Sequence, residues 1–237
     1  MTSTIFSMTA PTRIDPAWLS PTWFIDADSP QVEAFAAEVL GGPRPVGDTD
    51  PVDTAIKLFY AVRDGLRYDP YGMDRNREAF RASHITGLDS AWCVTKSILF
   101  TAAARNQGIP ARLGFADVRN HLSSEKLLER LGTDLFIWHG YSELLLNGRW
   151  FKLSTAFNIE LCDRFGVKAL DFDGTDDALM HPFDKAGNRH MEYVNQRGSY
   201  NDLPYDQILS DFAALYPAWG GEVASSAESA GDDAFSV

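Results

Sequence analysis

Apolar side chains recur at helical spacing in the first part of the chain and predict two early helices. The segment 30–40 is followed directly by a Gly-Gly-Pro sequence, which stops a helix. Between Pro51 and Gly65 the apolar positions mostly share one helical face, and Asp50 can cap the first turn. We therefore expect helices over 30–40 and 51–65.

A third apolar stripe begins near Ser90, a residue type that favours the N-cap position of a helix. Gly108 and Pro110 should end this helix, because glycine accepts the left-handed C-terminal turn and proline prevents continuation. A short strand over 111–116 and a helix over 123–131 are expected to follow.

A β-hairpin is predicted further along the chain. Two strand-like segments, 139–146 and 149–154, flank Asn147-Gly148, the preferred pair for a tight two-residue turn. With Leu146 opposite Arg149, paired residue numbers sum to 295.

The segment 163–204 is interpreted as loop-rich, and a last helix is expected over 205–216. Helices come first and antiparallel strands follow, which argues for an α+β fold with N-terminal helices packed on an antiparallel sheet. Residues 1–30 are expected to form an arm whose aromatic side chains dock onto a domain over 31–219. The small, acidic segment 220–237 is expected to be disordered.

Composition and net charge limit the classes of function and partner that we expect for this chain. The 237 residues are 45% hydrophobic and 23% charged, as in ordinary globular proteins. The net charge of −12 argues against nucleic acid and anionic membrane as partners. No apolar run reaches the ~18 residues of a membrane span, and the N-terminus lacks a secretory signal pattern, so we expect a cytoplasmic protein.

Cys93 and His139 are the candidate chemical groups. Cys93 falls in the first turn of the helix predicted from Ser90, where the helix dipole favours a thiolate. His139 opens a predicted strand and could act as the base that a cysteine nucleophile needs. Each residue alone is also compatible with a packing role, Cys93 as a small buried hydrophobe and His139 as a satisfied strand-end histidine.

The hairpin register offers two candidates for a third group that would orient the imidazole. Ser154 and Asn158 share the face of His139 and are its diagonal neighbours if the strand continues. Asn158 is the better partner, because an amide oxygen can accept a hydrogen bond from a ring N–H.

The sequence around these residues resembles the transglutaminase-like superfamily of papain-like cysteine enzymes. The resemblance lies in GLDSAWCVTKSILFTAAARNQGIPARLGFADV, which starts at Gly87, and in WHGYSELLLNGRWFKLS, which starts at Trp138. It implies a papain-like core in which Cys93 is the nucleophile and His139 the general base and then acid. The family's acidic residue usually stands where this chain has Ser154.

The resemblance implies acyl transfer through a thioester on the cysteine. We expect hydrolysis of an amide or ester bond in a peptide or small molecule, with no cofactor and no metal. Two alternatives stay open. One is a transglutaminase or acyltransferase that passes the acyl group to an amine, and the other is a catalytically inactive binding module with the same fold. The oligomeric state and the identity of the substrate are not predicted.

Overall fold

The computed structural model describes residues 14–44, 50–121, 123–179 and 183–216. Seven α-helices are found in these ranges: α1 Pro30–Leu40, α2 Pro51–Gly65, α3 Ala82–Ile85, α4 Cys93–Asn106, α5 Glu125–Leu131, α6 Ile159–Arg164 and α7 Tyr205–Leu215. Short 3-10 helices cover Pro16–Trp18 and Arg77–Phe80.

Within the described ranges the strands form two sheets. A small parallel pair joins β1, Arg67–Tyr68, to β2, Ser90–Ala91. The main sheet has the order β5-β4-β3-β6. Its neighbouring strands are all antiparallel. The strands of this sheet are β3 Ala111–Asn120, β4 Leu135–Leu146, β5 Arg149–Leu153 and β6 Met191–Tyr200. Early helices and a later antiparallel sheet confirm the α+β class.

Local signals explain the elements that the sequence predicts well. Both α1 and α2 begin at a proline that follows a capping side chain, Ser29 or Asp50, and both have the predicted bounds. The hairpin pairs Leu146 with Arg149 and Ser142 with Leu153, so the predicted register is confirmed. Helix α7 also begins where expected.

Two predictions about local structure are wrong. Ser90 does not cap α4, because it lies in β2 and pairs with Arg67; the N-cap is Trp92, and Cys93 is the first helical residue. The segment 163–204 is not only loop, because it contains β6. This strand lies at the sheet edge and is mostly exposed, so its sequence lacks the alternation that marks a half-buried strand.

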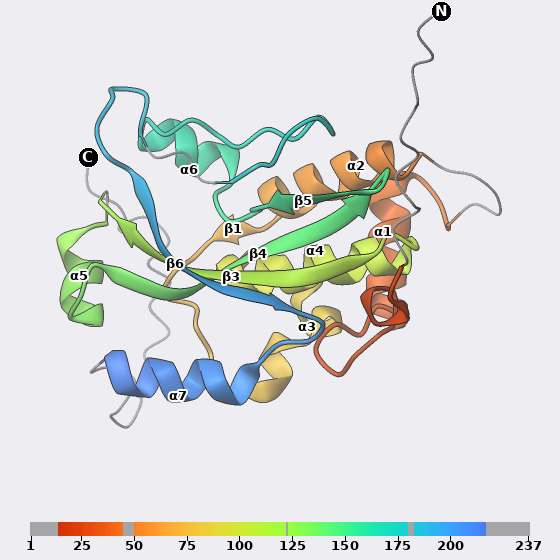
Figure 1. Ribbon diagram of the computed structural model, residues 1–237, viewed down its shortest axis with the longest axis horizontal. Coiled ribbons are helices and arrows are strands. Elements are labelled where there is room, and N and C mark those ends of the chain that lie inside the picture. The colour runs from red at the N-terminus through yellow and green to blue at the C-terminus, as the bar shows by residue number, and fades with distance from the viewer. Residues whose placement is uncertain (1–13, 45–49, 122, 180–182, 217–237) are drawn as a thin grey trace, which may run out of the picture.

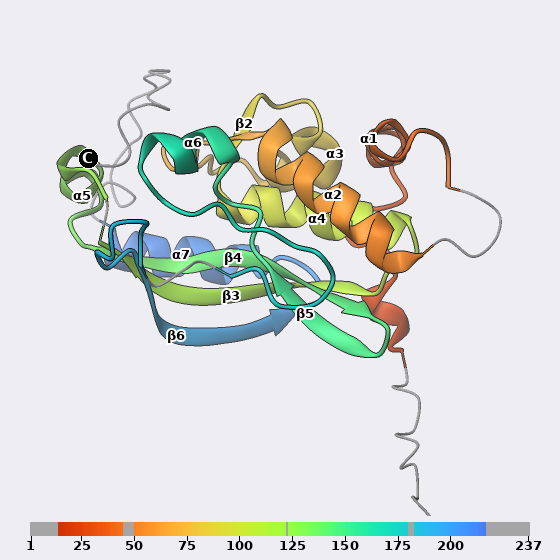
Figure 2. The same ribbon diagram turned by 90° about the horizontal axis from the view of Figure 1, so that it is seen from above.

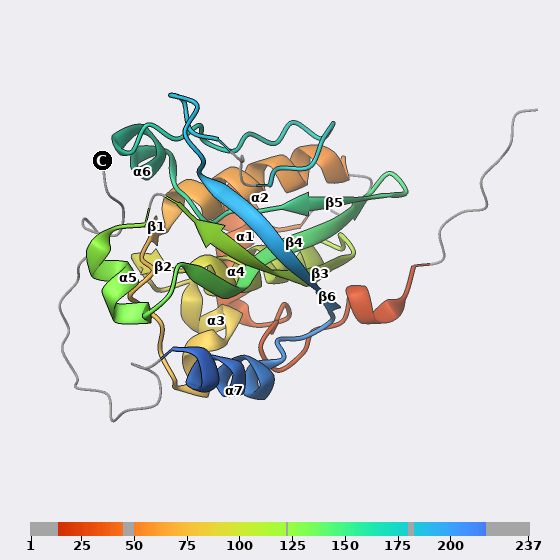
Figure 3. The ribbon, with the colours of Figure 1, turned by 60° about the vertical axis from the view of Figure 1, so that its left-hand side comes forward.

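The helices α1 to α4 form one layer against one face of the main sheet (Figures 1 and 2). Helix α4 is the central element of this layer, and every residue from Cys93 to Arg105 is buried. Ser142 of β4 ties the sheet to this helix, since its hydroxyl accepts from Thr101 at 2.9 Å and donates to the Ser97 carbonyl at 3.0 Å. Helices α6 and α7 lie at opposite edges of the sheet (Figure 3).

Strand β4 and helix α4 approach each other most closely at Gly140. A Cβ atom added there would lie 3.0 Å from the Val94 Cα and 3.3 Å from the Cys93 carbonyl oxygen. These are tight contacts with backbone atoms that cannot rotate away. The absence of a side chain at position 140 therefore sets the distance between the strand that carries His139 and the helix that begins at Cys93.

The described part of the N-terminal arm contacts the body through aromatic rings. Phe24 is buried, and Trp18 packs edge-to-face on Trp150 with ring centroids 4.9 Å apart. Residues 1–13 and the predicted acidic tail 220–237 lie outside the described residues. In the ranges that are described, no helix has the length and apolar character needed to cross a membrane.

Candidate active site

Cys93 stands at the N-terminus of α4, which follows β2 after a single residue. Its side chain is 6% exposed. Thr95 supports the start of the helix, because its hydroxyl accepts the Trp92 backbone N–H at 3.2 Å. The first amides of a helix have no partner within the helix. Those of Cys93 and Val94 lie close enough to the sulfur to favour its ionised form.

His139 lies on a part of β4 whose edge is open to Cys93, because the neighbouring strand β5 is short. Strand β5 ends at Leu153, opposite Ser142, so within the described residues the part of β4 before Ser142 pairs with no strand on that side. Cys93 lies along this open edge, and the backbone amide of Gly140 is directed to its sulfur. The nucleophile candidate is thus held by the residue next to the base candidate.

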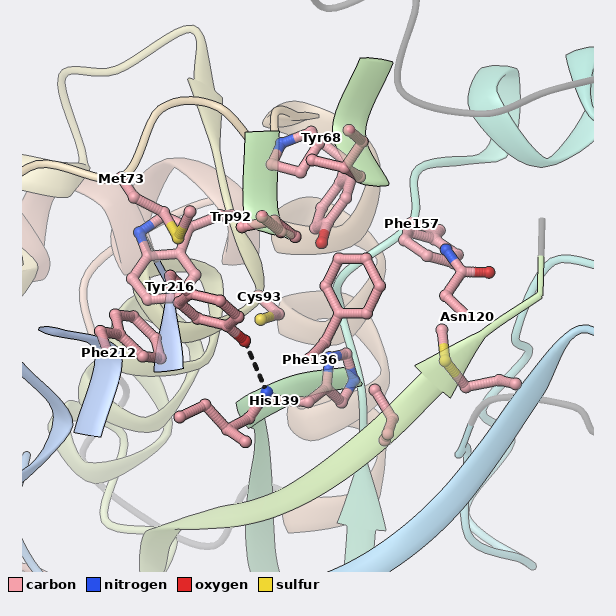
Figure 4. A pocket seen from close by; sticks show the side chains of 16 residues that line it. Tyr68, Met73, Trp92, Cys93, Asn120, Phe136, His139, Phe157, Phe212 and Tyr216 are labelled. Atoms are coloured by element: carbon pink, nitrogen blue, oxygen red, sulfur yellow. Dashed lines mark hydrogen bonds between the residues drawn. The ribbon is translucent and has the colours of Figure 1, made fainter. Parts of the chain in front are cut away.

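Tyr216 forms hydrogen bonds with another part of the open edge of β4. Its hydroxyl accepts the Ile137 N–H at 2.8 Å and donates to the Leu135 carbonyl at 3.1 Å. One side chain from the residue after α7 thereby replaces the hydrogen bonds of a missing strand. Figure 4 shows the Tyr216 ring beside Cys93.

The residue before His139 has a strained backbone. Trp138 has φ of +60°, a left-handed conformation that bulky residues rarely adopt. The β3–β4 register shifts here, between the pairs Ala116–His139 and Val118–Phe136. Such bulges are common next to active sites, where they redirect a side chain.

Three charged side chains, of which Asp117 is buried, hold this bulge in place. The Asp117 carboxylate accepts the Trp138 backbone N–H at 3.1 Å and also binds the Arg197 guanidinium. Asp211 of α7 accepts from the Trp138 indole at 2.8 Å and from Arg197 at 2.6 Å. The direction of His139 therefore depends on contacts from β3, β6 and α7.

Cys93 and His139 both point into a pocket that is lined mainly by apolar side chains (Figure 4). The space in and around the pocket, including the open solvent at its mouth, is about 610 Å³. Its aromatic residues are Tyr68, Trp92, Phe136, Phe157, Phe212 and Tyr216.

Burial keeps both candidate groups neutral at rest. It raises the pKa of the Cys93 thiol to about 11, although the amides of Gly140 and Val94 act in the opposite direction. Burial also lowers the pKa of His139 to about 4. The thiolate expected from the helix dipole is therefore not the resting form, because desolvation outweighs the dipole and the amides.

Asn158 and Ser154, the two candidates for the third group, differ in their hydrogen bonding. Asn158 is buried, and its amide oxygen accepts the Tyr68 backbone N–H at 3.1 Å, which ties the start of α6 to β1. The Ser154 hydroxyl and the His139 Nε2 atom are both buried, and neither has a hydrogen-bond partner in the described part of the chain. A role of Asn158 or Ser154 in orienting His139 stays a prediction.

Other residues of the quoted sequence blocks form a separate cluster. Glu143 accepts from Arg112 at 2.6 Å and from the Ser199 hydroxyl at 2.9 Å, so it joins β4 to β3 and β6. The Arg112 guanidinium lies 4.1 Å from the centre of the Trp150 ring. These residues stabilise the sheet and do not line the pocket.

The low pKa of His139 predicts a loss of stability in acid. Between pH 6.5 and about 4 the unfolded chain binds a proton at this residue and the folded chain does not, so the free energy of unfolding falls as pH falls. The full effect is about 3 kcal/mol. Urea unfolding followed between pH 7 and 4 should show a shallower decline for His139→Gln than for the unchanged protein.

His84→Gln is the matched control for this experiment, because His84 is exposed. Its stability should follow the pH dependence of the unchanged chain. Parallel curves for His139→Gln and the unchanged protein would contradict the burial of a neutral imidazole at this site.

Sequence reasoning did not identify Asp117, Gly140, Asp211 or Tyr216 as parts of the site. The Gly after His139 was the only local signal, since a glycine within a strand often marks close backbone approach. The other three act over long sequence distances, which periodicity cannot detect.

Comparison with known proteins places this site in a family. Residues 42–155 match the family model of the Transglutaminase-like superfamily. No curated protein matches the chain. A solved structure from Cytophaga hutchinsonii, described as a candidate cysteine protease, is similar at 15% sequence identity with a TM-score of 0.46.

That similarity covers 90% of this chain and 53% of the other, so the chain spans about half the length of the protein it matches. The family match includes α4, the hairpin and both candidate residues, Cys93 and His139. Residues 42–155, slightly under half of the chain, thus match the transglutaminase-like superfamily.

Proposed function

We propose that this protein is a cysteine-dependent acyl-transfer enzyme that hydrolyses amide or ester bonds. The observation that carries the proposal is the placement of Cys93 and His139 in one pocket. Both line one pocket, and the amide of Gly140, the residue after His139, is directed to the Cys93 sulfur. Nucleophilic catalysis by a cysteine needs a base near the thiol, and His139 is the histidine that shares this pocket with Cys93.

In the proposed reaction the Cys93 sulfur attacks the carbonyl carbon of the substrate while the thiol proton passes to the His139 imidazole. The tetrahedral intermediate then breaks its bond to the leaving nitrogen or oxygen, which takes the proton from the imidazolium. This leaves a thioester on Cys93. Water attacks the thioester, gives a proton to the imidazole, and releases the carboxylic acid as the thiol is restored.

The resting protonation states set the order of these events. Because burial disfavours both the thiolate and the imidazolium, the proton moves only as the new carbon–sulfur bond forms. His139 therefore acts as a general base in the transition state and not as one half of a preformed ion pair. The backbone amide of Cys93, at the start of α4, is the proposed donor to the oxyanion.

Trapping the acyl-enzyme tests this proposal. With p-nitrophenyl acetate, mass spectrometry should find an acetyl group on Cys93 of the unchanged protein. His139→Gln should slow formation of this adduct about 10²-fold or more, as loss of a general base does. The same assay on Asn158→Ala and Ser154→Ala tests which residue orients the imidazole. Acetylation should slow in the variant that lacks the orienting residue.

Cys162→Ser is the matched control, because Cys162 is the other free, buried cysteine and lies on α6. This variant should be acetylated on Cys93 at the unchanged rate. Acetylation of Cys162 in place of Cys93, or a rate that does not depend on His139, would contradict the proposal. Added primary amines separate hydrolysis from transfer: a hydrolase releases acetate at the same rate with or without them.

A catalytically inactive binding module is the second candidate function. It is favoured by the raised pKa of Cys93 and by a His139 whose Nε2 atom has no partner in the described ranges. Such a module would bind small ligands in the pocket while Cys93 stays unmodified by every ester and amide tried.

A further inference from the structure

The pocket around Cys93 differs from a site for charged substrates. None of the described residues that line it is an aspartate, glutamate, lysine or arginine. Its one histidine, His139, has a pKa of about 4 and is neutral at pH 7. A charged group placed here would lose its hydration without gaining an opposite charge, which is costly.

Apolar side chains flank the thiol on two sides (Figure 4). On one side Trp92 and Phe212 have ring centroids 6.1 Å apart, and Phe212 is 5.2 Å from Tyr216. We call Trp92, Phe212 and Tyr216 the aromatic wall. On the other side Tyr68 and Phe157 pack edge-to-face at 4.8 Å.

Part of this lining comes from outside the part of the chain that matches the family. The match ends at residue 155, whereas Phe157, Met191, Phe212 and Tyr216 all lie beyond it. The matched part therefore supplies the two candidate reacting groups, and later segments supply two of the three rings of the aromatic wall. A surface of this origin is suited to setting specificity.

We propose that the aromatic wall selects substrates whose acyl group is uncharged and carries an aromatic ring or a branched alkyl chain. This inference rests on the proposed function and names the substrate class of the same site. The ring of such an acyl group would lie against the exposed edge of the aromatic wall and bring its carbonyl to the Cys93 sulfur. Acyl groups that carry a carboxylate or an ammonium group are excluded by desolvation.

Binding measured without catalysis tests the inference. Isothermal titration calorimetry on Cys93→Ala would compare hydrocinnamamide with its para-carboxylate derivative, which has the same skeleton and one negative charge. The neutral amide should bind at least about tenfold more tightly. Phe212→Ala in the same background should weaken binding of hydrocinnamamide about tenfold.

Leu215→Ala is the matched control, because Leu215 lies on the same helix but is 37% exposed and does not line the pocket. It should leave the affinity unchanged. Should Phe212→Ala fail to fold, Met73→Lys gives a second test, since Met73 lines the pocket but is only half-buried. The introduced ammonium group should reverse the preference, so that the carboxylate derivative binds more tightly.

Equal or tighter binding of the charged derivative to Cys93→Ala would overturn the inference, as would equal binding by Phe212→Ala and Leu215→Ala. Failure of the proposed function looks different. In that case the neutral amide still binds selectively, but no ester acylates Cys93 in the unchanged protein.

Discussion

Replacing Asp117 with alanine is expected to destabilise the fold by about 3 kcal/mol, the lower end of the cost of removing one partner from a buried ion pair, because its partner Arg197 is only half-buried. Asp117 is 6% exposed and binds Arg197, the Trp138 backbone amide and the Asn195 side chain. Its loss leaves the half-buried Arg197 guanidinium with fewer partners. It also frees Trp138 from one of the contacts that hold its left-handed backbone.

The same substitution should slow acetylation of Cys93, because Trp138 directly precedes His139. Displacing a catalytic group by about 1 Å can cost about 10²-fold in rate. Urea unfolding gives the stability change, and the acetylation rate is measured well below the melting temperature. Asp117→Asn should recover part of the rate, since an amide oxygen can still accept the Trp138 N–H.

Asp134→Ala is the matched control for Asp117→Ala. Asp134 also pairs with an arginine, Arg119, at 2.8 Å, but both side chains are more than two-fifths exposed. Exposed pairs contribute only about 0–1 kcal/mol. A similar loss of stability in both variants would show that Asp117 does not hold the bulge.

Replacing Gly140 with alanine is the second large expected effect. The new methyl group would press on the Val94 Cα and the Cys93 carbonyl oxygen, at 3.0 and 3.3 Å. Strand β4 and helix α4 must then separate by a few tenths of an ångström. Overpacking of this kind costs about 1–3 kcal/mol.

The effect on chemistry should exceed the effect on stability. Separation moves the Gly140 amide away from the Cys93 sulfur and changes the distance from the thiol to His139, so acetylation should slow by about 10²-fold. Gly65→Ala is the control, because nothing lies within 4 Å of a Cβ at that position near the end of α2. Normal acetylation by Gly140→Ala would refute the assigned role of this contact.

Sequence patterns predicted the elements whose signals are local. Capping residues marked the starts of α1 and α2, and the Asn147-Gly148 turn set the register of the hairpin. The quoted motif blocks also identified Cys93 and His139, which the structure places in one pocket.

Features that depend on distant contacts were missed. Ser90 was expected to cap α4, but its pairing with Arg67 in a parallel bridge takes it out of the helix. Strand β6 has almost no buried side chains and is defined by its backbone pairing to β3. The contacts of Asp211 and Tyr216 with the site join positions more than 70 residues apart, which no local pattern encodes.

The position of α7 has a consequence for how the protein is made. Ribosomes deliver the N-terminal residues first, so the segments with Cys93 and His139 emerge well before Asp211 and Tyr216. Until those two residues arrive, the Trp138 indole lacks its acceptor and the open edge of β4 lacks its hydroxyl. A nascent chain therefore carries its thiol before it carries a finished pocket, and the site is completed only when synthesis has passed α7 and Tyr216.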